Sequence, residues 1–336
     1  MKNLITGNEA ITKGLIKSGL KFFSAYPITP SSQILHSLIK SKVTHIIAED
    51  EIAAINMVIG ASLAGSKAAT ATSGPGFSLK QESIGYAFKT NTPLVIVNAQ
   101  RVGPSTGMPT YSSQGDILAV KHGSHGDYVN IVFYPNSVEE CYRYSIEAMN
   151  AAEESLSPVI LLTDGMLSMM TESVDLKGIK VEIKKRDFKP LGKEKRKISG
   201  LLTKDNLPCT TEPKVYQEWY AERKAQILNT SKKYEFYEYS GNKKSDTLLI
   251  AYGTTSRVIS ELKNEYAIFR PIRLFPIISK LKTIAESYKK IVVIEMNDSQ
   301  YQGELQSFLH RELQSITQLG GELSLNKIKN ELKRLC

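Results

Sequence analysis

Short apolar runs alternate with segments of helical periodicity along the first half of the chain. The apolar runs have the length of strands and cover residues 20–26, 43–49, 66–72, 93–99, 128–134 and 158–164. The segments in which apolar residues recur at helical spacing cover 8–19, 30–40, 51–65, 78–90 and 137–155. Because strands that alternate with helices form parallel sheets covered by helices, the pattern predicts an α/β domain over residues 1–170.

Residues 171–243 break this pattern. They are rich in lysine, contain three prolines and show no clear strand alternation, although residues 213–229 have the pattern of a polar helix. The earlier pattern then resumes, with strands at 245–253, 267–275 and 290–297 and helices at 254–266, 277–288 and 303–313. We therefore expect a basic connecting segment over 171–243 and a smaller α/β domain over 244–336.

Composition narrows the classes to which the protein can belong. Its 336 residues, 41% of them hydrophobic, are enough for two globular domains. No apolar run approaches the length of a membrane span, and residues 1–10 lack the apolar core of a signal peptide, so we expect a cytoplasmic protein with no membrane partner. The net charge of +9 comes without a nucleic-acid recognition motif, which argues against nucleic acid as a ligand.

Much of the positive charge lies in residues 180–197. A run of this kind is most often a solvated face or loop. A second interpretation is a docking surface for an acidic partner or for a phosphate-rich cosubstrate.

The cysteines are too scattered to hold a metal ion or a cluster. Cys141, Cys209 and Cys336 form no CxxC pair and no Cys/His group, and the histidines show no metal-binding spacing. We therefore predict no metal site in this chain. If the protein carries out redox chemistry, a second chain must hold the metal.

Four unusual segments follow predicted strands directly. They are "YPITP" at 26–30, "AEDE" at 48–51, "TSGPG" at 72–76 and "QRVGPSTG" at 100–107. Open parallel sheets bind ligands at the carboxyl ends of their strands, where these segments gather. Their coincidence predicts a binding site along one edge of the sheet.

Thr29 stands between Pro27 and Pro30 at the start of the helix predicted over 30–40. Since Pro30 suits the first helical turn, Thr29 falls at the N-cap position, and a helix cap is the plain interpretation. The other interpretation is that the free N–H groups of this helix start face an anion. The local sequence is compatible with both.

Three acidic residues, Glu49, Asp50 and Glu51, crowd the start of the next helix, where the helix dipole favours negative charge. Only Glu51 also lies at the head of the apolar stripe of this helix. The stripe comprises Ala54, Ile55, Val58 and Ala61. A carboxyl group at this position should be partly desolvated, which suits one that shares a proton with a ring nitrogen.

The "TSGPG" segment, with Gly74 and Gly76 around Pro75, matches neither the dinucleotide fingerprint nor a Walker loop. A tight turn accounts for it, and such a turn can also bring backbone close to a flat ligand. Arg101 stands at the end of a later strand run, "VIVNAQ" at residues 95–100. An ordinary ion pair is one interpretation of this arginine, and a bidentate clamp on a carboxylate is the other.

Taken in order, "YPITPSS", "EDEIAA", "TSGPGFSL", "QRVGPSTGMPT", "PVILLTDG", "RLFPI" and "VVIEMN" resemble the α subunits of the 2-oxoacid:ferredoxin oxidoreductases. The two-subunit 2-oxoglutarate type is the most similar. Only residues 170–240 depart from the family pattern, because "SGLLTKDNLP" stands where members of the family often have an acidic, His-containing segment. The resemblance implies a thiamine-diphosphate-binding, pyrimidine-type parallel-sheet domain and a smaller transketolase C-terminal-like α/β domain, and it implies no site residue in the latter.

The resemblance also implies a site and a reaction. Thiamine diphosphate would be shared with a β subunit that carries the diphosphate and Mg²⁺ site and an iron-sulfur cluster. Glu51 would be the catalytic, cofactor-activating glutamate, Ser73, Gly74 and Gly76 would contact the cofactor, and Thr29 and Arg101 would bind the oxoacid. An α2β2 assembly would decarboxylate a 2-oxoacid, with 2-oxoglutarate favoured, to an acyl-CoA, using coenzyme A and passing electrons to ferredoxin.

Three alternatives stay open. The first is a different substrate, which would be pyruvate or a branched-chain or aromatic oxoacid, since nothing in the sequence defines the distal part of the pocket. A thiamine enzyme of the acetohydroxyacid-synthase kind would require a much longer chain. A non-catalytic assembly or regulatory homologue would not be expected to keep Thr29, Glu51 and Arg101 together.

Overall fold

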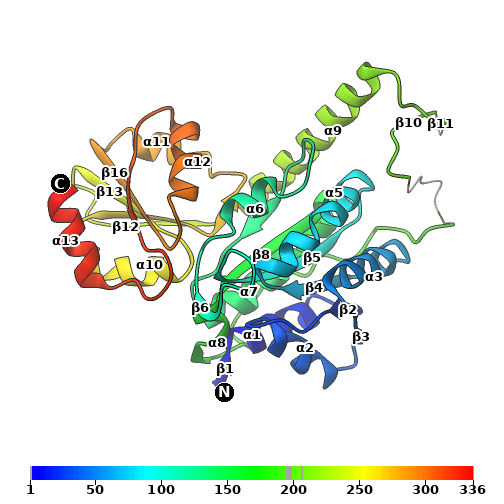
Figure 1. Cartoon of the computed structure of the whole chain (residues 1–336), viewed down its shortest axis with the longest axis horizontal. Coiled ribbons are helices and arrows are strands. Elements are labelled where there is room, and N and C mark those ends of the chain that lie inside the picture. The colour runs from blue at the N-terminus through cyan, green and yellow to red at the C-terminus, as the bar shows by residue number, and fades with distance from the viewer. Residues whose placement is uncertain (1, 194–198, 206, 336) are drawn as a thin grey trace.

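The computed structural model describes residues 2–193, 199–205 and 207–335. The predicted α/β fold is confirmed, since two open sheets covered by helices appear as two lobes in Figure 1. Of the basic run over 180–197, residues 194–197 lie outside the described residues, and so does Cys336.

The first sheet has the strand order β15-β7-β8-β5-β4-β2-β3, and the strands expected from the sequence are mutually parallel. These are β2 (Phe22–Ala25), β3 (Thr44–Ile47), β4 (Ala68–Thr72), β5 (Leu94–Val102), β7 (Ile131–Phe133) and β8 (Pro158–Asp164). Two further strands are antiparallel: β6 (Met108–Ser112) pairs with β5, and β15 (Arg273–Phe275) pairs with β7. The central strands are buried almost throughout, as expected of parallel strands covered on both faces.

Helices cover both faces of this sheet. One face packs against α1 (Gly7–Lys17), α2 (Ser32–Ile39) and α7 (Val138–Ser155). The other packs against α3 (Glu51–Leu63), α4 (Gly74–Leu79), α5 (Gln81–Lys89) and α6 (Ile117–His122). Alternate residues of β5 point to opposite faces, so Val95 and Val97 join the first core while Leu94 and Ile96 join the second. A short helix, α8 (Gly165–Met169), follows β8.

The second sheet has the order β12-β14-β13-β16-β17. Its strands are β12 (Tyr237–Gly241), β13 (Thr247–Ile250), β14 (Ala267–Pro271), β16 (Lys290–Glu295) and β17 (Gln314–Thr317), of which only β12 is antiparallel to its neighbour. The helices around it are α10 (Gly253–Ile259), η2 (Ser260–Leu262), α11 (Lys280–Ala285), α12 (Gln300–Leu309) and α13 (Leu325–Leu335). Its inner face shares one continuous core with the α3 and α5 face of the first sheet.

The strand predicted over 267–275 is two strands in two different sheets, and this part of the prediction is wrong. Residues up to Pro271 pair within the second sheet, whereas Arg273–Phe275 crosses to β7 of the first. Pro271 has no backbone N–H to continue a ladder. Apolar periodicity cannot reveal the break because both strands are buried.

The connecting segment contains strands that the sequence does not predict. β9 (Thr171–Val174) pairs with β1 (Asn3–Thr6), and β10 (Thr203–Lys204) pairs with β11 (Leu207–Pro208). The predicted polar helix is α9 (Pro213–Ser231), and η1 (Lys232–Tyr234) follows it. The division of the chain at 170 and 243 stays a prediction.

Part of the basic run is anchored to the first domain. Lys184 forms an ion pair with Glu154 of α7, and Arg186 forms one with Glu153. Lys67 donates hydrogen bonds to the carbonyl oxygens of Ser18 and Lys184. Lys184 is exposed, as the solvated-loop interpretation predicts, whereas that interpretation is wrong for Arg186, whose side chain is 10% exposed.

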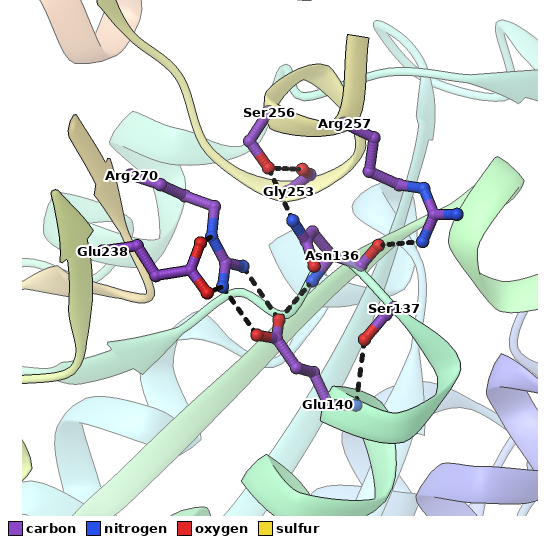
Figure 2. Close-up of polar contacts among 8 residues, drawn as sticks. All are labelled: Asn136, Ser137, Glu140, Glu238, Gly253, Ser256, Arg257 and Arg270. Carbon is purple, nitrogen blue, oxygen red and sulfur yellow. Dashed lines mark hydrogen bonds and ion pairs between the residues drawn. The ribbon is translucent and has the colours of Figure 1, made fainter. Parts of the chain in front are cut away.

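A network of charges joins the start of α7 to the second sheet, as Figure 2 shows. Arg270 of β14 donates to both carboxylate oxygens of Glu140, at 2.6 and 2.8 Å, and its Nε donates to Glu238 at 2.9 Å. Arg257 of α10 donates to the carbonyl oxygen of Asn136 at 3.0 Å. Because the Arg270 side chain is only 4% exposed, the Glu140 carboxylate compensates a buried charge.

We expect Glu140→Gln to lower the free energy of unfolding by about 2 kcal/mol, because Arg270 exchanges two charge-assisted hydrogen bonds for a neutral partner. Glu139→Gln is the matched control, since Glu139 lies in the same first turn of α7 but is exposed. It should change stability by less than about 0.5 kcal/mol. Chemical denaturation of both variants measures the difference, and equal effects would contradict a special role for the Glu140 pair.

Candidate functional site

Glu51 begins α3 and is buried, with 6% of its surface exposed. The neighbouring Asp50 supplies the helix cap, since its Oδ1 accepts from the Ala53 N–H at 2.6 Å. The carboxyl group of Glu51 is thus not needed for capping. The apolar stripe behind it is buried as predicted at Ala54, Ile55 and Val58.

The "TSGPG" segment packs directly on Glu51. A Cβ atom at Gly76 would lie 2.5 Å from both Cγ and Oε1 of Glu51 and 2.3 Å from the Thr72 hydroxyl. Only a residue without a side chain fits between them. The two residues that the sequence analysis placed at one edge therefore lie in contact, on α3 and α4.

Ser73 is the N-cap residue of α4 and is fully buried. Its hydroxyl makes no capping bond, and within the described parts of the chain it has no hydrogen-bond partner. A buried polar group without a partner is costly unless a ligand satisfies it.

Lys80 follows α4 and is absent from the predicted site. Its side chain is fully buried, and its Nζ donates to the backbone oxygen of Glu51 at 2.8 Å. Burial lowers the pKa of Lys80 to about 8, against the opposing effect of the Glu51 and Asp50 carboxylates. The same stripe rule that selects Glu51 would have found it, because Lys80, Ile84 and Phe88 share the buried face of the predicted helix.

Arg101 and Thr29 are brought together at the end of β5. Arg101 is 8% exposed, and one guanidinium nitrogen donates to the Thr29 carbonyl oxygen at 3.0 Å. The Nε atom of Arg101 is buried and has no partner among the described residues. Arg101 therefore keeps hydrogen-bonding capacity for a ligand.

Thr29 does not cap α2, and the N-cap prediction is wrong. The Thr29–Pro30 peptide bond is cis, and the chain turns through residues 29–31 before the helix starts at Ser32. Ser31 occupies the N-cap position without a capping bond. The carbonyl oxygen of Ile28 closes the turn by accepting from Ser32 N–H and the Ser31 hydroxyl.

A cavity of about 880 Å³ lies beside Arg101. Gly74 and Asp116 line it from the first domain, and Asn297 and Gln300 line it from the second. Burial raises the pKa of Asp116, which the Asn98 amide at 2.9 Å and the Arg101 charge partly counteract. Neither Asp116 nor any residue of the second domain belongs to the site predicted from the sequence.

Gln114 forms hydrogen bonds that join the second domain to the first domain beside this cavity. Its side chain donates to the Tyr252 carbonyl oxygen and accepts from the Thr255 hydroxyl and the Met296 N–H. Asn297 in turn donates to the Gln114 carbonyl oxygen at 2.8 Å. These contacts hold the Gly115 and Asp116 turn, which no local pattern reveals because its partners lie more than a hundred residues away.

The structure thus separates the predicted site residues into two groups. Glu51 and Gly76 meet at the start of α3, while Gly74 and Arg101 line the cavity. Within the described ranges, no three His, Cys, Asp or Glu side chains are placed to hold a metal ion. None of the helices in these ranges combines the length and apolarity needed to cross a membrane.

Known proteins resemble the chain over most of its length. The family model for pyruvate flavodoxin/ferredoxin oxidoreductase, thiamine diphosphate-binding, matches residues 13–240. The 2-oxoglutarate synthase subunit KorA of Methanocaldococcus jannaschii is 38% identical, with 94% of this chain and 95% of the relative covered. The ketoisovalerate oxidoreductase subunit VorB of Methanothermobacter marburgensis is 32% identical, with 99% and 97% covered.

A solved structure has the same fold. It is the 2-oxoglutarate:ferredoxin oxidoreductase from Magnetococcus marinus with 2-oxoglutarate, coenzyme A and succinyl-CoA bound, at a TM-score of 0.90 and 30% identity. The match covers 99% of this chain, which spans 65% of the solved chain.

The fold and its edge site define an oxidoreductase subunit with a thiamine-diphosphate-binding domain. The chain belongs to the pyruvate flavodoxin/ferredoxin oxidoreductase family, and the predicted family resemblance is confirmed.

Proposed function

We propose that this chain is the α subunit of a 2-oxoglutarate:ferredoxin oxidoreductase. It would convert the oxoacid to an acyl-CoA with release of CO₂, and a β subunit would pass the electrons to ferredoxin. The observation that carries the proposal is the buried Glu51 packed against Gly76, at the sheet edge that also holds Arg101. The 2-oxoglutarate preference is supported by the relatives named as 2-oxoglutarate synthase subunits.

The residues present fit the pyrimidine end of thiamine diphosphate. The unpartnered Ser73 hydroxyl and the backbone of the "TSGPG" turn offer polar contacts, and the absence of a side chain at Gly76 lets this turn pack directly on the Glu51 carboxyl. When bound, the cofactor supplies a nucleophilic carbon for the 2-oxo group and takes up the electron pair that decarboxylation releases. Glu51 would share a proton between its carboxyl oxygen and a ring nitrogen.

Arg101 would bind the carboxylate of the oxoacid, since it faces the cavity with a buried, unpartnered Nε. Thr29 would contribute its hydroxyl beside it, because its carbonyl oxygen is already held by Arg101.

We expect Arg101→Ala to raise the KM for the oxoacid about ten- to a hundredfold, the equivalent of one charge-assisted pair, with a smaller change in kcat. Arg101→Lys keeps the charge without the planar guanidinium group, so its KM should lie between those of the wild type and Arg101→Ala. Steady-state kinetics of the assembled complex measures these values. An unchanged KM in Arg101→Ala would rule out the clamp.

A β subunit would complete the site. Exposed apolar side chains come from the elements that carry the site residues and from strands next to them in the chain or sheet, as is common where a partner docks. They include Ile46 and Ile47 of β3, Ile52 of α3, Leu79 of α4 and Met108 of β6. The Mg²⁺ ion, the diphosphate contacts and the iron-sulfur cluster are proposed to belong to the β subunit, in an α2β2 assembly.

Co-expression with the candidate β subunit tests the function directly. The complex should reduce a viologen dye anaerobically, dependent on coenzyme A, with 2-oxoglutarate preferred in a panel of oxoacids. Preference for a branched-chain oxoacid would favour the second candidate, which the VorB relative supports. A cofactor-loaded complex that is inactive with every oxoacid would indicate a non-catalytic homologue, and full activity of this chain alone would contradict a shared site.

A further inference from the structure

Lys80 joins α4 to α5 and is buried completely between these helices and α3. Its ammonium group donates to the backbone oxygen of Glu51, the first residue of α3. The lysine therefore holds the residue to which the proposed function assigns the proton transfer. Gly76 packs against the side chain of the same residue, where a Cβ atom would lie 2.5 Å from Glu51 Oε1.

The position is an unfavourable one for a cation. Full burial removes the ammonium from water, and the start of a helix repels positive charge through the helix dipole. The charges of Glu51 and Asp50 compensate only in part, because burial still lowers the pKa of Lys80 to about 8. A methionine of similar length would fill the space without this cost.

The groups that act electrostatically on Lys80 are the carboxylates of Glu51 and Asp50, both at the start of α3. The other strands that contact α4 and α5 are β5 and β8, and neither Arg101 nor Asp164 at their carboxyl ends is among the groups that act on Lys80. The carboxylates of Glu51 and Asp50 thus oppose part of the effect of burial on the pKa of Lys80.

Lys67 offers a direct comparison. It is also buried, and burial lowers its pKa too. Its ammonium, however, donates to the carbonyl oxygens of Ser18 and Lys184 and so ties the connecting segment to the first domain. Lys67 has a structural task, whereas Lys80 contacts the candidate catalytic residue itself.

We propose that Lys80 is a positioning residue that holds Glu51 at the start of α3 through a hydrogen bond to its backbone oxygen. The proposal rests on the function proposed above for Glu51. The protonated ammonium makes a charge-assisted hydrogen bond to the Glu51 backbone oxygen, which is stronger than the bond that a neutral amine would make. Loss of the ammonium proton withdraws this support, so activity should fall as the pH rises through about 8.

The test compares the wild-type complex with Lys80→Met and Lys80→Arg from about pH 6.5 to 9.5. We expect wild-type kcat/KM to decline above about pH 8. Lys80→Arg keeps its charge, so the decline should move to higher pH. Lys80→Met should lack this limb and be about tenfold less active at neutral pH, as expected for the loss of one charge-assisted hydrogen bond that positions Glu51.

Two further measurements separate positioning from structure. The near-ultraviolet circular dichroism of the bound cofactor should change with pH in the wild type and not in Lys80→Met. The melting temperature of Lys80→Met should exceed that of the wild type below pH 8, because the buried charge is then fully present. This difference should narrow from about pH 8 to 10.5, where the folded chain has lost the proton that the unfolded chain retains.

Lys67→Met is the matched control and should leave the pH profile unchanged. A wild-type complex with no decline across this range would overturn the inference, as would a Lys80→Met complex with the wild-type profile and dichroism. If Lys80→Met fails to assemble, the pH profiles of the wild type and of Lys80→Arg still test the inference. Full activity of Glu51→Gln would instead overturn the proposed function, which keeps the two failures distinct.

Discussion

We expect Glu51→Gln to lower the rate of oxoacid-dependent viologen reduction in the assembled complex by about 10²–10⁴-fold, because an amide cannot share a proton as the carboxyl group does. Glutamine has nearly the same shape, so it fits the buried space against Gly76 and Thr72 that a larger residue would not. Binding to the β subunit should therefore be retained. The expected result is an intact, cofactor-loaded complex that does not decarboxylate.

Glu49→Gln is the control for this variant. Glu49 lies two residues away and is exposed, so removal of its charge should leave the rate within about twofold of the wild type. Rates are measured under anaerobic conditions at saturating coenzyme A. Retained turnover in Glu51→Gln would remove Glu51 from the proposed mechanism.

Gly76→Ala should lower kcat by at least about 10²-fold, although the substitution adds only one methyl group. The new Cβ would approach Glu51 Cγ and Oε1 at 2.5 Å and the Thr72 hydroxyl at 2.3 Å, distances that real Cβ atoms do not adopt. The Glu51 carboxyl has to move, and a displacement of about 1 Å is enough to cost this factor. The KM for the oxoacid should change less, since Arg101 lies elsewhere.

Gly60→Ala is the matched control for the same chemical change. Gly60 lies in α3, on the helix that Glu51 begins, and a Cβ there would meet no atom within 4 Å. Because alanine is favoured over glycine inside a helix, this variant should be equally active and more stable by about 0.5–1 kcal/mol. If both variants had wild-type kcat, the close fit of Gly76 to Glu51 would have no catalytic importance.

Periodicity alone located the parts of the site that depend on local structure. Helix α3 begins at Glu51, which the sequence places at the N-terminal end of the apolar stripe. The Glu51 side chain is buried because it lies on that apolar face of the helix. The same rule applied to the next helix selects Lys80, which shares its face with Ile84 and Phe88. Lys80 is not among the predicted site residues, because a lysine in a helix ordinarily reaches solvent.

Other parts depended on contacts that no local pattern contains. The prediction for Thr29 assumed that Pro30 begins the helix, whereas the helix begins at Ser32 and Arg101 binds the Thr29 carbonyl oxygen. The two strands within 267–275 have the same apolar character but pair with different sheets. Propensity and periodicity describe neighbours along the chain, so they do not specify which distant segment completes a hydrogen bond.

By itself the sequence determined the six parallel strands of the first sheet and the helices between them, the family and the residues at the carboxyl edge, because all of these depend on local periodicity and short motifs. Only the tertiary structure decided how those residues meet. It placed Gly76 against Glu51, the Lys80 ammonium on the Glu51 carbonyl oxygen, and Asn297 and Gln300 of the second domain on the cavity beside Arg101. These arrangements arise from packing and hydrogen bonding between segments far apart in the chain, where burial fixes partners that composition cannot specify.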